Sequence, residues 1–115
     1  MKVSRLNKPQ PWDTGDATEN IREIAASDFA LSLTGHVEER MEERDLNTGD
    51  ILHVLKRGYV YEAAQPSARR KCFKYCVDAS TPNSGNRTVR VICVPCTNPL
   101  EIKIVTVMWR DEINK

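Results

Sequence analysis

The sequence predicts an α+β fold in which two to three N-terminal helices pack on one face of a three- to four-stranded antiparallel sheet. Before Gly58, helix-capping residues precede apolar residues at helical spacing. After Gly58, runs rich in β-branched residues alternate with short polar turns. Strands joined by short turns form antiparallel pairs. A chain of 115 residues is long enough for one domain with a modest core.

The chain divides into a short leader and one domain. We expect residues 1–15, which contain two prolines and a glycine with little periodicity, to form a flexible leader. Residues 16–115 should form a single α+β domain. Asp16, with Glu19 three residues later, predicts the N-terminus of a first helix that runs to about Ala26.

Two further helices follow a short run, residues 29–33, whose period fits a strand or a linker. Thr34 is a good N-cap for the second helix, which should bury Val37 and Met41. Asn47 or Thr48 caps the third helix, and Gly58 ends it. The expected strands are residues 59–63, 69–77, 87–94 and 100–109.

The charge is uneven along the chain. Residues 59–115 carry nine basic and five acidic side chains, a net charge of +4, whereas residues 35–58 carry four and six, a net charge of −2. Clustered Lys and Arg attract nucleic acid, although a mild bias also fits an ordinary surface. The sequence has no membrane-length apolar run and no secretory signal, so we expect a cytoplasmic protein without a membrane partner.

Four cysteines permit a zinc site in principle. They occur as C-x₃-C and C-x₂-C, at Cys72, Cys76, Cys93 and Cys96. Both pairs fall in strand-like runs rather than on the tight turns of zinc knuckles, so buried or surface thiols are the favoured interpretation. We therefore predict no metal and no cofactor. A zinc-dependent binding domain that uses the four cysteines remains a further hypothesis.

One helix and two strands carry residues suited to phosphate chemistry. His36 and Arg40 share a face of the second helix with Glu43 or Arg44; a solvated charged face is the alternative. In the strands, alternation places Arg70 and Lys74 on one side and Tyr75 on the other, the core side. Together with Arg90 of the next strand, the two basic residues could meet on one sheet face.

Such a cluster suits cleavage of RNA without a metal. Guanidinium groups stabilise the charged phosphorane, and a His, Glu or Tyr side chain transfers protons. The candidate catalytic residues are His36, Arg40, Arg70, Lys74, Tyr75 and Arg90. Tyr59, Tyr61 or Trp109 could stack on unpaired bases, although core packing is the favoured role of Trp109.

The segment Leu33-Thr-Gly-His-Val-Glu-Glu-Arg-Met-Glu-Glu-Arg-Asp-Leu46 resembles the H-x-x-x-R-M-x-x-R motif of a bacterial small-domain family. That family is grouped with the RelE/ParE-like toxins and is close in plan to BrnT. The resemblance covers about residues 29–110, and His36 and Arg40 match its motif. It implies an α+β fold and cleavage of mRNA, free or on the ribosome, with neutralisation by an antitoxin.

We therefore expect the toxin of a toxin–antitoxin pair, a metal-independent endoribonuclease with RNA and a cognate antitoxin as partners. The alternative is a non-catalytic binding or inhibitor module on the same fold that acts on a nucleic-acid machine through protein contacts. The N-terminal helix and the four cysteines depart from the family's pattern.

Overall fold

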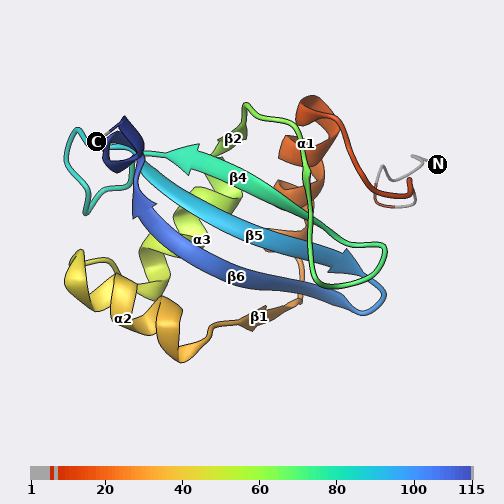
Figure 1. The fold of residues 1–115 in the computed structure, drawn as a ribbon, viewed down its shortest axis with the longest axis horizontal. Helices are drawn as coiled ribbons and strands as arrows, with labels where there is room; N and C mark the ends of the chain where they lie inside the picture. Colours follow the sequence, from red (N-terminus) through yellow and green to blue (C-terminus); the bar gives the residue numbers. More distant parts are fainter. Residues whose placement is uncertain (1–5, 7, 115) are drawn as a thin grey trace.

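The computed structural model describes residue 6 and residues 8–114 of the chain (Figure 1). The helices are α1 (Thr14–Ala25), α2 (Gly35–Glu43), α3 (Thr48–Arg57) and a C-terminal 3₁₀ helix, η2 (Arg110–Asn114). The strands are β1 (Ala30–Ser32), β2 (Tyr59–Val60), β3 (Gln65–Pro66), β4 (Phe73–Ala79), β5 (Val89–Thr97) and β6 (Leu100–Trp109). The α+β class predicted from the sequence is confirmed.

The sheet is mixed and has the strand order β1-β6-β5-β4-β2, with β3 paired to β4. All pairs are antiparallel except β1 with β6, which is parallel. The sheet therefore has more strands than the three or four expected. The additional strands are two or three residues long, and backbone pairing to a longer neighbour, rather than a sequence pattern of their own, makes them strands.

The helices α1, α2 and α3 cover one face of this sheet (Figure 1). Their buried residues, such as Ile21, Val37 and Ile51, belong to one cluster with the sheet residues Val91 and Ile104. Burial of apolar surface of this kind is the main stabilising contribution to the fold. No helix within the described part of the chain is long and apolar enough to span a membrane.

The helix caps follow the sequence signals in two of three cases. Thr34 accepts a hydrogen bond from the backbone N–H of Val37, and Asn47 forms a capping box with Asp50. For α1 the expected cap, Asp16, was wrong by three residues, because Asp13 caps the helix and accepts from the backbone N–H of Asp16.

Gly58 lies at a close approach between the end of α3 and β4. A Cβ atom there would lie 2.5 Å from the Val54 carbonyl oxygen and 2.6 Å from Cγ1 of Val77. Both distances are well inside van der Waals contact, so a larger residue would push the helix from the sheet. Gly58 therefore ends α3 and also sets the spacing between α3 and β4.

The segment between β2 and β4 crosses the face of the sheet that the helices leave open (Figure 1). An ion pair between Arg69 and Glu101 of β6 joins it to that face. Lys71, at φ 68°, adopts the left-handed conformation and interrupts the extended chain. For this reason β4 begins at Phe73 rather than at the expected residue 69.

The described part of the expected leader is docked on the domain. Trp12 is buried, and its backbone N–H donates a hydrogen bond to the Tyr75 hydroxyl at 2.9 Å. The Gln10 amide donates to the Pro95 carbonyl and accepts from the Phe73 N–H. These contacts attach residues 8–13 to the start of β4 and the end of β5. Residues 1–5 and 7 lie outside the described residues.

Candidate functional site

The structure does not bring the six sequence-predicted site residues to one place. His36 and Arg40 lie on α2, which packs against β6, three strands away from the β2 edge of the sheet. His36 is exposed, and Arg40 forms an ion pair with Glu43 at 2.6 Å. An exposed helix face with such an ion pair matches the solvated charged face, which the sequence analysis gave as the alternative to a phosphate site.

Lys74 and Arg90 lie on the helix-free face, as their alternation predicted. Lys74 and Asp78 are four residues apart in β4 and therefore share a face, and Arg90 is paired with Asp78. Arg70 is not part of a strand: it is exposed in the turn before β4 and lines a different cavity, described below. The expected meeting of Arg70 with Arg90 on one sheet face is therefore wrong, because the turn at Lys71 ends the extended backbone.

Tyr75 points to the opposite, helix-covered face, where it is fully buried. Its ring stacks with Trp12, with ring centroids 5.7 Å apart. Burial raises the pKa of its hydroxyl to about 12, and the hydrogen bond from Trp12 only partly offsets this increase. In this position the hydroxyl holds the N-terminal segment and has no solvent-facing path to a substrate.

Arg90 lies at the centre of a buried ion-pair network. Its Nε and Nη2 atoms donate to the two carboxylate oxygens of Asp78 at 2.8 and 2.9 Å, and Nη2 also donates to Glu62 at 2.9 Å. The side chains of Arg90 and Asp78 are both only 6% exposed. The hydrogen bonds from Arg90 to Asp78 raise the pKa of Arg90, outweighing the effect of burial. Its charge is thus compensated within the protein.

This network forms the floor of a cavity of about 580 Å³ at the β2 edge of the sheet, which we call the Tyr–Arg cleft. Its charged and aromatic lining residues are Arg57, Tyr59, Tyr61, Glu62, Asp78, Arg90 and Arg110. Arg57 is at the C-terminus of α3, and Arg110 begins η2. Three guanidinium groups and two carboxylates therefore line one hollow, with an excess of positive charge.

The most unusual feature of the cleft is a pair of exposed tyrosines. Tyr59 and Tyr61 are 52% and 68% exposed, and their rings stack with centroids 6.0 Å apart and planes at 24°. The Arg22 guanidinium lies 4.5 Å from the Tyr59 ring centroid, and Arg22 also donates to the Gly58 carbonyl. Cation–π contact and stacking therefore hold two aromatic faces at the surface.

Sequence reasoning had named both tyrosines as possible base-stacking residues but had not identified Arg57, Glu62 or Arg110. Arg57 and Arg110 are separated by more than fifty positions, and only the packing of α3 and η2 around β4 brings them together. Glu62 follows the Tyr-Val-Tyr run directly, which is the one local signal that could have linked it to the tyrosines.

The third candidate aromatic residue, Trp109, is partly buried against the core. The Arg87 guanidinium covers its ring at 4.1 Å from the centroid, and Arg87 is held by Asp111 at 2.8 Å. Core packing, the favoured role for Trp109, is consistent with this position.

The cysteines are divided between different surroundings. Cys93 belongs to the buried core, where burial raises its pKa, whereas Cys96 and Cys72 line the cavity at the N-terminal end of β4. Among residue 6 and residues 8–114, no three His, Cys, Asp or Glu side chains gather in a group suited to a metal ion.

A family model described as "Domain of unknown function (DUF4258)" matches residues 33–109. The match begins just before α2 and ends with the last residue of β6, so it includes α2, α3 and strands β2 to β6 but neither α1 nor β1. No curated protein and no solved structure matches the chain.

Proposed function

Given that this chain belongs to the DUF4258 family, we propose that it binds single-stranded RNA in the Tyr–Arg cleft and cleaves it without a metal, as the toxin of a toxin–antitoxin pair. The observation that carries this proposal is the exposed, stacked Tyr59–Tyr61 pair beside three guanidinium groups. Aromatic faces that stack on unpaired bases, next to cations that hold the phosphate backbone, are the usual means of binding single-stranded nucleic acid.

Within the cleft, the cations divide into two kinds. Arg57 is exposed and Arg110 is 40% exposed, 3.5 Å from Asp78, so both can turn toward a phosphate. Arg90, which the sequence had suggested as a phosphate ligand, is held by two carboxylates and fixes the position of Glu62 instead. Arg57 and Arg110 are thus the proposed phosphate ligands.

Glu62 is the proposed proton acceptor. Its side chain is 51% exposed and one of its oxygens accepts from Arg90 at 2.9 Å, which orients the carboxylate at the edge of the cleft. Glu62 would remove the proton from a ribose 2′-OH. That oxygen then attacks phosphorus, the bond to the 5′-oxygen breaks, and solvent protonates the departing 5′-oxygen. The guanidinium groups would stabilise the charge that develops on phosphorus.

RNA binding can be measured with a fluorescently labelled single-stranded RNA and the full chain. Changing both Tyr59 and Tyr61 to Ala should weaken binding at least about tenfold, since stacking contributes ~1–3 kcal/mol per base. Changing both to Phe is the matched control, because it keeps the aromatic faces, and it should bind within about twofold of wild type. Equal binding by wild type and the Ala variant would remove the cleft from RNA recognition.

Cleavage can be measured on the same RNA in the presence of a chelator. Glu62→Gln should lower the cleavage rate by roughly 10²- to 10⁴-fold while leaving RNA affinity nearly unchanged, because it removes only the proton acceptor. His36→Gln is the comparison variant and should cleave at the wild-type rate if Glu62 has the assigned role. RNA left intact by wild-type protein would exclude the nuclease part of the proposal.

A non-catalytic binding module is the second candidate, and one observation favours it. The charge of Arg90 is already compensated by Asp78 and Glu62. Such an ion-pair network can make a binding surface rigid without taking part in catalysis. Such a module would leave RNA intact and arrest no growth when expressed, but would still form a stoichiometric complex with a protein partner. A toxin would arrest growth, and co-expression of its cognate antitoxin would relieve the arrest.

A further inference from the structure

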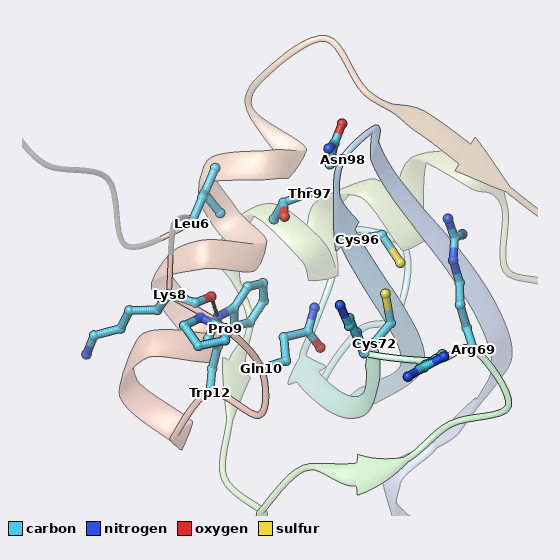
Figure 2. Close-up of a pocket in the computed structure, with 12 residues that line it drawn as sticks. Leu6, Lys8, Pro9, Gln10, Trp12, Arg69, Cys72, Cys96, Thr97 and Asn98 are labelled. Carbon is cyan, nitrogen blue, oxygen red and sulfur yellow. Dashed lines mark hydrogen bonds between the residues drawn. The ribbon is translucent and has the colours of Figure 1, made fainter.

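Two cysteines meet at the end of the sheet opposite to the Tyr–Arg cleft. Cys72 lies just before β4, Cys96 lies in β5, and both side chains line the same cavity. Figure 2 shows the two sulfur atoms pointing toward one another. A side-chain hydrogen bond with Cys72 is also one of the causes that raise the pKa of Cys96.

The thiol pair opens into a second cavity of about 670 Å³, which we call the thiol pocket (Figure 2). Four cationic side chains line it, and none of its twelve lining residues is acidic; the cations are those of Lys8, Arg69, Arg70 and Lys71. Lys8 and Arg69 form ion pairs with Asp16 and Glu101, which lie outside the lining. A cavity with this lining favours anionic ligands.

The chain before β4 is held so that Cys72 faces this pocket. The Ser67 hydroxyl donates to the Cys72 carbonyl at 2.6 Å, and the Cys72 N–H donates to the Arg69 carbonyl at 3.2 Å. The left-handed backbone at Lys71 completes the turn. Cys72 is partly exposed, whereas Cys96 is buried beneath it at 3% exposure.

We propose that Cys72 and Cys96 form a thiol–disulfide exchange site whose substrate is a small anionic disulfide of the glutathione type. Cys72 is the accessible nucleophile, Cys96 is the resolving thiol, and the basic lining holds the substrate carboxylates. This site is separate from the RNA cleft, and the proposal does not depend on the proposed function.

The exchange proceeds in two balanced steps. The Cys72 thiolate, after losing its proton to solvent, attacks one sulfur of the small disulfide, whose S–S bond breaks and releases a thiolate. Cys96 then gives up its proton to that thiolate and attacks the Cys72 sulfur. This attack displaces the second small thiolate, which takes up from solvent the proton that Cys72 released. The protein dithiol loses two electrons, and the small disulfide gains them.

The surroundings of Cys96 agree with this order of events. Burial raises the pKa of Cys96 to about 12, and the hydrogen bond with Cys72 and the charge of Cys72 contribute to this increase. The charge of Arg69 acts in the opposite direction. Cys96 is therefore protonated while Cys72 is free. Once Cys72 is part of a mixed disulfide, its hydrogen bond and charge no longer raise the pKa of Cys96, so resolution becomes easier.

The test uses the reduced full chain and two probes, oxidised glutathione and the cationic disulfide cystamine, with intact and peptide mass spectrometry. Oxidised glutathione should yield a peptide pair linked through Cys72 and Cys96. The Cys96→Ala variant should stop at one glutathione on Cys72, whereas Cys72→Ser should form neither product. Cys76→Ser, the control for a partly exposed thiol on the adjoining strand β4, should still form the linked peptides.

The charge preference needs a separate comparison. Changing Arg70 and Lys71 together to Glu should slow the reaction with oxidised glutathione by about tenfold or more relative to cystamine, because focused charge controls the encounter with an ionic substrate. Circular dichroism verifies that each variant is folded. The reaction of wild type with oxidised glutathione tests the proposal even if a variant does not fold. The proposal would be overturned if wild type did not form the linked peptides. It would also be overturned if the ratio of the two rates were the same in the charge-reversed variant as in wild type.

Discussion

The two ends of β4 use charged side chains in different ways. At its C-terminal end, Arg90 is buried in a network with Asp78 and Glu62 beneath the exposed tyrosines of the Tyr–Arg cleft. At its N-terminal end, Arg69 and Lys71 lie at the surface around the thiol pocket. Burial therefore decides whether a cation stabilises the fold or remains available to a ligand, and the net charge of a segment does not show which.

The strongest test of this comparison is Arg90→Ala at the buried end. Asp78 would remain buried without its bidentate partner, so we expect the free energy of unfolding to fall by about 3–5 kcal/mol. Urea denaturation measures the change. Arg57→Ala removes an exposed arginine of the same cleft and should change stability by less than about 0.5 kcal/mol. Similar losses for both variants would contradict the role assigned to burial.

Tyr75→Phe tests the attachment of the N-terminal segment at the other end of β4. The Trp12 N–H loses its acceptor in a buried position, so we expect a loss of about 1–3 kcal/mol in the free energy of unfolding. Thermal unfolding and the rate of proteolysis before α1 report the change. Tyr61→Phe, in which the lost hydroxyl is exposed, should have no measurable effect, and a neutral Tyr75→Phe would mean that Trp12 docks without this hydrogen bond.

Glu112→Gln tests an ion pair of intermediate exposure. Arg44 donates two hydrogen bonds to Glu112, which lower the pKa of Glu112 from 4.5 to about 2. A lowered pKa of a carboxyl group stabilises the fold above its ordinary value, and this contribution is lost as the pH falls. We expect wild type to be more stable than Glu112→Gln by less than about 1 kcal/mol near neutral pH.

A pH series of the same variant shows in which direction the stabilisation by Glu112 changes with pH. The difference in unfolding midpoint between wild type and Glu112→Gln should stay constant above about pH 5 and shrink from pH 4.5 toward pH 2. A difference that persists undiminished at pH 2 would show that packing, rather than the charge of Glu112, stabilises this contact.

Arg69→Ala should have the smallest effect. Its ion pair with Glu101 has side chains that are 48% and 27% exposed, so we expect a small loss of stability that disappears in high salt. Urea denaturation at low and high salt measures both quantities. A loss as large as that of Arg90→Ala, or one that salt does not affect, would remove the contrast between the two ends of β4.

The local signals in the sequence predicted the helical half well. Thr34 and Asn47 were recognisable caps because their side chains accept from N–H groups only three residues away. The longest strand, Leu100–Trp109, was predicted with its bounds, since a long β-branched run has no other stable conformation near a core. The two-residue strand β3 carries no comparable signal, because its pairing partner lies on β4.

The candidate site was much less predictable. Alternation correctly placed Lys74 and Arg90 on one face and Tyr75 on the other, but it could not show that Arg90 has an acidic partner in Asp78. Arg70 was misplaced because a single left-handed residue, Lys71, ended the strand early. Without the tertiary structure, an arginine available to a phosphate and one held in an ion pair have the same pattern in the sequence.

The sequence by itself determined the α+β class, the helix boundaries near their caps and the inward-facing sides of the longer strands, since these depend on contacts within a few residues. Only the tertiary structure decided which charges are compensated, that Tyr59 and Tyr61 lie beside Arg57 and Arg110, and that Cys72 lies beside Cys96. Those features depend on strand register and on the packing of segments far apart in the chain, which the periodicity of a single segment does not encode.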